Sequence, residues 1–320
     1  MLARTARSAM LLTQWLAARY RALGRNARLY LLSNLLQAAT TGAVVILYTL
    51  YLSALGFHKD FIGLVLLAGT LGGGLGIIPA NALVNRLGYR AMLIWSDLLG
   101  GVAIAVQIVD PTAPIILITS VGVGASVAVV LVVNTPLLTT YSTPAERTAL
   151  LGLNGALNFL AGVVGTLLGG FLPEVFRSAA VAHSPLLHAL GPLLVARGEA
   201  RALELAMLAA GALAVPSIIP IILMREDRPT RGGASAGRSS SSAAPPLREQ
   251  LAAAVRSART LMAGVVGRFT VTQALLGFGA GLFIPFLSNY FVEQLHTSTG
   301  FYSVLLATIA SAGALAGSVG

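Results

Sequence analysis

The chain has 320 residues, of which 56% are hydrophobic and only 10% are charged, and its net charge is +10. A soluble domain normally carries about 25% charged residues, so this composition excludes a single water-soluble core and indicates a membrane protein. The sequence contains no cysteine, which excludes disulfides, thiolate metal sites and cysteine nucleophiles.

Long apolar runs predict eight membrane-spanning helices, because a helix needs about 20 mostly apolar residues to cross a bilayer. The expected fold is therefore an all-α polytopic membrane protein. The predicted spans are 29–55, 61–83, 91–109, 113–139, 148–172, 202–224, 268–292 and 301–320.

Every basic residue except Lys59 is an arginine, and most arginines precede the first span or occupy alternate loops. The positive-inside rule then predicts that the N-terminus lies in the cytoplasm. The expected location is the plasma membrane, which is the inner membrane of a bacterium. The loop 173–201 is an exception that also carries arginine, and a short interfacial helix is predicted near 186–196. Because the arginines flank apolar runs and form no solvated patch, nucleic-acid binding is not expected.

Two polar segments divide the chain. Residues 1–27 place apolar side chains on one helical face with arginines around them, which predicts a cytoplasmic amphipathic helix on anionic lipid. Residues 225–260 are rich in Gly, Ser, Pro and Arg and are predicted to be a disordered cytoplasmic linker. Residues 28–224 would form a six-helix bundle, and residues 261–320 would begin a second bundle.

A weak internal repeat supports this division. "RLYLLSNLL" at 28–36 aligns with "RFTVTQALL" at 268–276, and the hydropathy and the juxtamembrane arginine agree between the two copies. Six spans, a polar linker and a second copy are the layout of a transporter built from two parallel six-helix halves. Since the second copy contains about two spans, we expect either a piece of a twelve-span protein or a bundle completed in another way.

The loop between spans two and three, "NALVNRLGYRAML" at 81–93, resembles the signature of the major facilitator superfamily, G-x-L-a-D-R-x-G-R-R/K-x-x-L. The resemblance implies a cytoplasmic gating loop, whose acid caps a helix and pairs with basic residues. Here Asn85 replaces that acid, so a weaker gate is expected; a hairpin that only sets topology is the alternative. The gating-loop residues implied are Leu83, Asn85, Arg86, Gly88 and Arg90.

Asp97 is the one acid clearly inside an apolar run. An ionisable side chain in a span is costly unless it is paired, so it is a functional candidate. Its stretch "LIWSDLL" at 93–99 resembles the siderophore and macrolide exporters of the superfamily. We expect a gating role in which Asp97 pairs with an arginine of the loop, such as Arg90, or with the N-terminus of a helix in the other half. A substrate or proton site and a snorkelling interfacial acid are the alternatives.

Span five carries small residues in the spacing of the exporters' signature G-x8-G-x3-G-P-x2-G-G, although Ala161 replaces a glycine and Thr166 replaces the proline. Small residues let another helix approach closely, so these positions are predicted to be helix-packing glycines; ordinary small-residue packing is the alternative. They are Gly152, Gly165, Gly169 and Gly170. The arginine that proton-coupled relatives often carry in span four is replaced by Ile118, which leaves a coupling proton an open expectation.

Polar uncharged residues recur on one face of span one and in spans four, five and seven, and the resemblance implies that such helices line a central cavity. Interhelical hydrogen bonding is the alternative for each of them. The predicted cavity residues are Asn34, Gln37, Thr41, Tyr48, Asn134, Asn154, Asn158, Gln273 and Asn289.

The resemblance implies a secondary active transporter that moves small organic molecules by alternating access, and its exporter features favour efflux, as in multidrug resistance. A metabolite uptake carrier and a non-transporting scaffold or receptor on a degenerate carrier fold are the alternatives. An enzyme is not expected, because the four histidines show no metal-ligand spacing and the glycine-rich "GTLGGGLG" lies within a span. We expect no cofactor and no metal.

Overall fold

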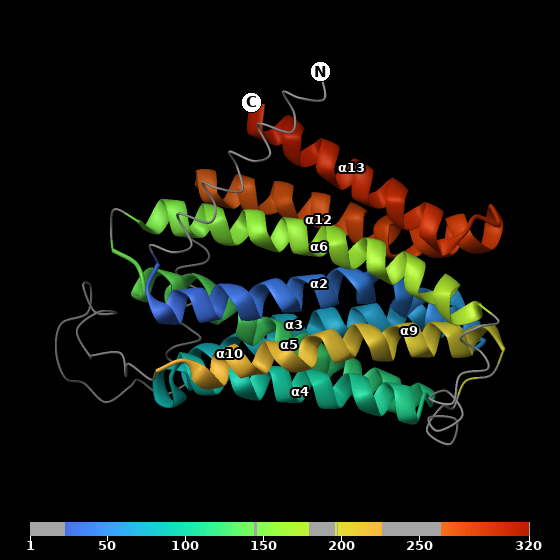
Figure 1. Ribbon diagram of the computed structural model, residues 1–320, viewed down its shortest axis with the longest axis horizontal. Coiled ribbons are helices and arrows are strands. Elements are labelled where there is room, and N and C mark those ends of the chain that lie inside the picture. Colours follow the sequence, from blue (N-terminus) through green and yellow to red (C-terminus); the bar gives the residue numbers. More distant parts are fainter. Residues whose placement is uncertain (1–22, 144–145, 179–195, 197, 226–263, 320) are drawn as a thin grey trace.

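The computed structural model describes residues 23–143, 146–178, 196, 198–225 and 264–319, and most of these residues lie in helices (Figure 1). The predicted all-α fold is confirmed. The helices are α2 (Arg25–Ala54), α3 (Lys59–Leu87), α4 (Tyr89–Val109), α5 (Ala113–Thr140), α6 (Arg147–Arg177), α9 (Glu199–Ala214), the 3-10 helix η2 (Val215–Ser217), α10 (Ile218–Leu223), α12 (Val265–Asn289), the π-helix η3 (Tyr290–Gln294) and α13 (Thr299–Val319).

Seven helical stretches within the described residues are long and apolar enough to cross a membrane. One of them is composite, since α9, η2 and α10 follow one another over Glu199–Leu223. Pro216 lies in η2, where a proline removes a backbone donor and interrupts a helix. The eighth predicted span overlaps α13, whose apolar stretch Thr299–Ala312 is shorter than these seven, so this span stays a prediction.

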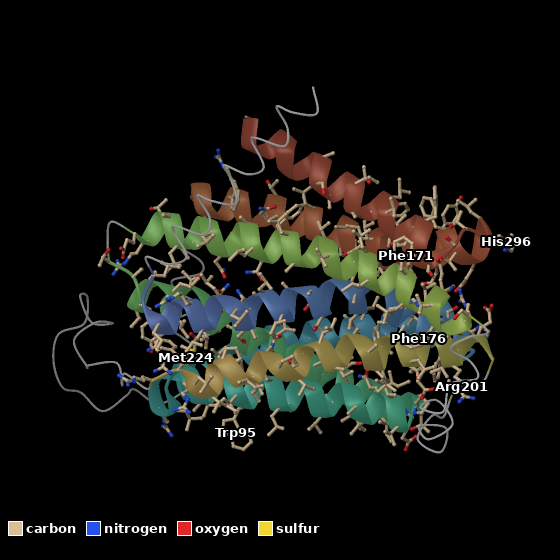
Figure 2. The ribbon with its side chains drawn as sticks, viewed as in Figure 1. Trp95, Phe171, Phe176, Arg201, Met224 and His296 are labelled. Carbon is tan, nitrogen blue, oxygen red and sulfur yellow. The ribbon has the colours of Figure 1, made fainter. Side chains whose placement is uncertain are left out.

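The helices alternate in direction, so the bundle has two ends. We call them the Gly88 end and the Gly56 end, after glycines in the α3–α4 and α2–α3 connections. Gly88 alone joins α3 to α4, and its φ of 83° is a left-handed conformation that favours glycine. Figure 2 labels Met224 near the Gly88 end, at the left, and His296 at the Gly56 end, at the right.

Two sets of helices are distinguished below. The first half is α2 to α10, and the second half is α12, η3 and α13. The described residues of an apolar core at the Gly88 end, which include Tyr30, Leu93 and Leu137, all belong to the first half. A second core includes Leu47 and Tyr51 of the first half, and Tyr302 of the second half belongs to it. The halves therefore share apolar packing towards the Gly56 end.

Glycines allow the closest helix contacts of the first half. A Cβ atom at Gly124 of α5 would collide with the backbone of Gly69 in α3, and one at Gly72 would collide with Val121. The glycine-rich run 69–76 thus lies inside α3 and packs on α5, as close helix packing requires.

Several predicted segments lie outside the described residues. They are the amphipathic segment 1–27 apart from 23–27, the interfacial helix near 186–196 apart from Ala196, and the linker 225–260 apart from Arg225. The domain boundaries derived from these segments stay predictions.

Candidate functional site

Asparagine side chains of three helices meet inside the first half. Asn34 Nδ2 of α2 donates to Asn154 Oδ1 of α6 at 2.7 Å, and Asn158 Nδ2 donates to the same oxygen at 3.1 Å. Asn154 Nδ2 lies 3.5 Å from Asn134 Oδ1 of α5, which also accepts from the Tyr30 hydroxyl at 2.9 Å. We call these five residues the amide cluster. Four of the predicted cavity residues are therefore in contact, and they hydrogen-bond across helices of one half.

Asp97 is hydrogen-bonded to α2, the helix that also carries Asn34 of the amide cluster. Its Oδ1 accepts a hydrogen bond from Gln37 Nε2 at 2.5 Å, and its Oδ2 is buried without a hydrogen-bond partner. The Nη2 of Arg90, the arginine expected as its partner, donates to the backbone carbonyl oxygen of Ile222 at 2.7 Å. In this conformation the carboxylate and the loop arginine thus have separate partners.

The predicted gating loop is held to its own half. Arg90 joins the start of α4 to α10 through Ile222, while Leu83 and Arg86 are exposed at the end of α3. Gly88 supplies the sharp turn between the two helices. The side chain of Asn85 lies outside the described part of the chain.

The remaining predicted cavity residues lie outside the amide cluster. The Tyr48 hydroxyl lies 3.4 Å from Ser120 Oγ, which also accepts from Gln107 Nε2 at 3.2 Å. Thr41 and Gln273 are exposed. Asn289 is 2% exposed and lies at the contact between the halves. The lining of a single cavity by all nine residues stays a prediction.

The predicted packing glycines differ in their surroundings. Cβ atoms at Gly165 and Gly169 would collide with the backbone of Ala39 and Ala43 in α2, and one at Gly170 would collide with Ser303 in α13. Gly152 has no neighbouring atom within 4 Å of such a Cβ. Three of the four positions therefore permit a close helix approach.

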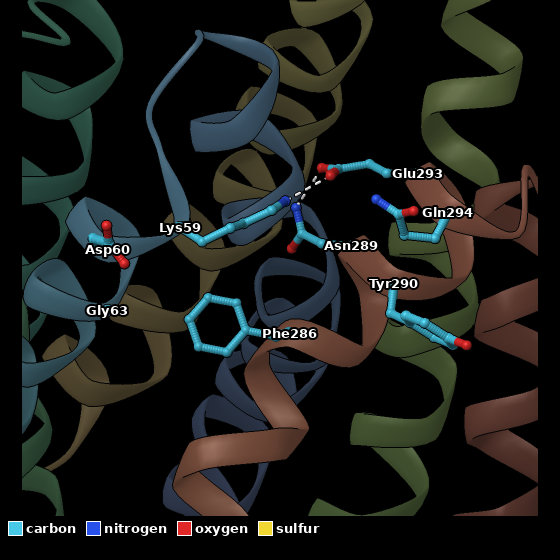
Figure 3. A pocket seen from close by; sticks show the side chains of 8 residues that line it. All are labelled: Lys59, Asp60, Gly63, Phe286, Asn289, Tyr290, Glu293 and Gln294. Carbon is cyan, nitrogen blue, oxygen red and sulfur yellow. Dashed lines mark hydrogen bonds and ion pairs between the residues drawn. The ribbon is translucent and has the colours of Figure 1, made fainter.

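A cleft of about 470 Å³ lies between α3 and the end of α12 (Figure 3). Its lining includes Asn289, which was predicted, and Lys59 and Glu293, which the sequence interpretation missed. Lys59 Nζ forms an ion pair with Glu293 Oε2 at 2.6 Å across this cleft. The sequence does contain a signal for these two residues, because Lys59 is the only lysine of the chain and Glu293 is the only acid after residue 260. The described residues contain no group of three His, Asp or Glu side chains that could hold a metal ion.

Comparisons with known proteins place this architecture in a family. The structure is similar to the crystal structure of a bacterial homolog of the human lysosomal transporter Spinster, in an inward-facing and unoccupied conformation. The TM-score is 0.62 at 16% identity, and the likeness covers 92% of this chain and 60% of that one, so this chain spans less than two thirds of that protein's length. A search of curated protein sequences finds no match. The sequence model of the Major Facilitator Superfamily matches residues 29–320, nearly the whole chain, and the chain therefore belongs to that superfamily.

Proposed function

We propose that the protein is a secondary active transporter, which moves small organic molecules across the membrane by alternating access. Membership of the superfamily supports membrane transport in place of an enzymatic reaction. The observation that carries the mechanism is the unequal packing of the two halves. Among the described residues, the core at the Gly88 end draws on the first half alone, whereas the core towards the Gly56 end includes Tyr302. Two bodies that meet at one end can rock about that contact and expose a central site to either side.

The orientation we propose puts the Gly88 end in the cytoplasm of a bacterial cell, at its inner membrane. Arginines at the ends of several helices support it, since positive charge is retained on the cytoplasmic side. Those of the described residues at the Gly88 end are Arg25, Arg28, Arg86, Arg90, Arg147, Arg225 and Arg268, whereas Arg177 and Arg201 lie at the Gly56 end. The first bundle would then be 28–224, the linker 225–260 would be cytoplasmic, and the second bundle would begin at 261.

The solute we propose is a small organic molecule with neutral polar groups. The amide cluster offers donors and acceptors that now satisfy one another, such as Asn34 and Asn154, and a solute could exchange for them at little cost. Asp97 is the one acid in the span α4, and its unpartnered oxygen is the available position for a coupling proton. The exporter-like glycines Gly165 and Gly169 favour efflux over uptake.

The test compares transport in inverted and right-side-out vesicles that contain the protein. Solute accumulation in inverted vesicles alone supports efflux, and accumulation in right-side-out vesicles alone would identify an uptake carrier. The double variant Asn34→Ala with Gln37→Ala should lose transport, with the exposed Val45→Ala as the matched control on α2. A protein that transports nothing in either orientation would support the scaffold or receptor instead.

A further inference from the structure

A chain of polar contacts joins the two halves at the Gly56 end. Lys59 Nζ of α3 donates to Glu293 Oε2 at 2.6 Å and to Ser53 Oγ of α2 at 3.2 Å. One turn deeper, Thr49 Oγ1 of α2 lies 2.9 Å from Ser288 Oγ of α12, and both residues are buried. Figure 3 shows Lys59 and Glu293 pointing towards each other across the cleft.

The carboxylate of Glu293 is held by one group from each half. Asn289 Nδ2, on the same half, donates to Oε1 at 2.6 Å, while Lys59 of the first half binds Oε2. Glu293 belongs to the π-helix η3, a rare helix type that is found frequently at functional sites. Asn289 also reaches the first half, because its Nδ2 lies 3.4 Å from the backbone oxygen of Thr49.

A second carboxylate makes the reciprocal contact. Glu174 of α6, in the first half, accepts a hydrogen bond from the backbone N–H of Gly300 at 2.8 Å. Gly300 lies in the first turn of α13, where the unsatisfied N–H groups and the helix dipole favour a negative charge. Gly170, one turn before Glu174 on α6, packs against Ser303, one turn after Gly300 on α13. Each half therefore supplies one acid that the other half binds.

Among the described residues, these side-chain contacts between the halves lie at the Gly56 end. Residues 268–284 of α12 are exposed, and Figure 1 shows α13 diverging from the bundle towards its C-terminus. The structure thus holds the Gly56 end closed, while the predicted gating loop belongs to the Gly88 end.

We propose that Lys59, Asn289, Glu293 and Glu174 form a reversible lock that must open before the Gly56 end can open. The side chains of Lys59 and Glu293 are 47% and 33% exposed, so water can replace either partner. An ion pair in such a setting stabilises weakly, whereas a fully buried pair would be costly to separate. Several weak contacts between the halves are suited to a lock that breaks and re-forms in every transport cycle. The inference rests on the proposed alternating access.

The test uses the absence of cysteine from the chain, because an introduced cysteine is then the only thiol. Ser288→Cys places it at a position that is 3% exposed when the lock is closed. The labelling rate with a membrane-impermeant maleimide then reports the open fraction. Adding Lys59→Gln or Glu293→Gln should raise this rate about two- to fivefold, as expected for the loss of a partly exposed ion pair. The charge-swapped pair Lys59→Glu with Glu293→Lys should return it towards the starting value.

Asp60→Asn is the matched control, because Asp60 lines the same cleft and is not in the ion pair. Its labelling rate should stay unchanged. Oxidation of Thr49→Cys with Ser288→Cys should form a cross-link that stops transport until it is reduced, which also shows that the variants are folded. An unchanged labelling rate in Glu293→Gln, with cross-linking intact, would overturn the lock. Since labelling needs no solute, failure of the lock is distinguishable from failure of the transport function.

Discussion

Arg90 donates through its Nη2 to the backbone carbonyl oxygen of Ile222, 2.7 Å away, and so joins the start of α4 to α10 within the first half. A carbonyl at a helix end has no partner within its own helix, so this arginine satisfies a group that would otherwise need water. The contact gives the loop 81–93 a structural role that is separate from any closing of the two halves.

The first prediction concerns this contact. Arg90→Gln should lower the free energy of unfolding by about 1.5 kcal/mol, the lower range for a hydrogen bond to a charged group. Arg86→Gln should change it by less than about 0.5 kcal/mol, because Arg86 is exposed and its substitution leaves the contact intact. Thermal unfolding of both variants in detergent measures the difference. Equal stabilities would mean that the carbonyl of Ile222 finds water as readily as arginine.

The second prediction restores the acid of the superfamily's signature. Asn85→Asp should strengthen a gate at the Gly88 end, because a carboxylate at this position can pair with loop arginines and cap a helix. The population should shift towards the state closed at that end. A single cysteine at Thr139, near the end of α5, reports it through a slower labelling rate.

The control for the restored acid is Asn81→Asp, which adds the same charge one turn earlier on α3. If both variants label at the rate of the parent protein, the loop sets topology and does not act as a gate.

The third prediction separates the charge of Asp97 from its hydrogen bond. Asp97→Asn keeps an oxygen that can accept from Gln37 and removes the ionisable group, so the fold should be retained. If coupling rests on Asp97, the dependence of transport on a pH gradient should disappear in proteoliposomes while transport driven by the solute gradient continues. Retained dependence on the pH gradient would place coupling at another residue.

Gln37→Ala is the complementary variant for Asp97. It removes the donor and leaves a buried carboxylate with neither oxygen bonded, which should destabilise the protein by about 1–3 kcal/mol. Asp97→Asn combined with Gln37→Ala should recover part of that loss. Thermal unfolding of the three variants tests the expected order of stability.

The helices could be predicted from the sequence because apolar run length decides where a membrane helix lies, whereas side-chain partners depend on how each helix is rotated. Asp97 and Arg90 are two turns apart on one helix, which suggested a pair, yet Gln37 of another helix is the partner. The Lys59–Glu293 pair joins residues 234 positions apart, and no local pattern encodes such a contact. The asparagines of spans one, four and five could be singled out from the sequence because polar residues are rare in lipid-facing helices. Their hydrogen bonds to one another could not be predicted, since they depend on how three helices pack.

The last prediction tests the glycines of α6 by comparing positions on one helix. Gly165→Ala and Gly169→Ala would each place a methyl group against the backbone of α2, so the helices must separate. Overpacking of this kind should destabilise the protein by about 1–3 kcal/mol. Gly152→Ala meets no atom within 4 Å and should be neutral or stabilising by up to about 1 kcal/mol, because alanine favours a helix over glycine. Thermal unfolding and transport rates are measured for all three variants.

If Gly165→Ala unfolds at the temperature of the parent protein but transports more slowly, the close contact serves helix movement. If Gly165→Ala lowers both the unfolding temperature and the transport rate, the contact is needed first for packing. A Gly152→Ala variant as unstable as Gly165→Ala would show that spacing in the sequence, and not approach to α2, decides which glycines matter.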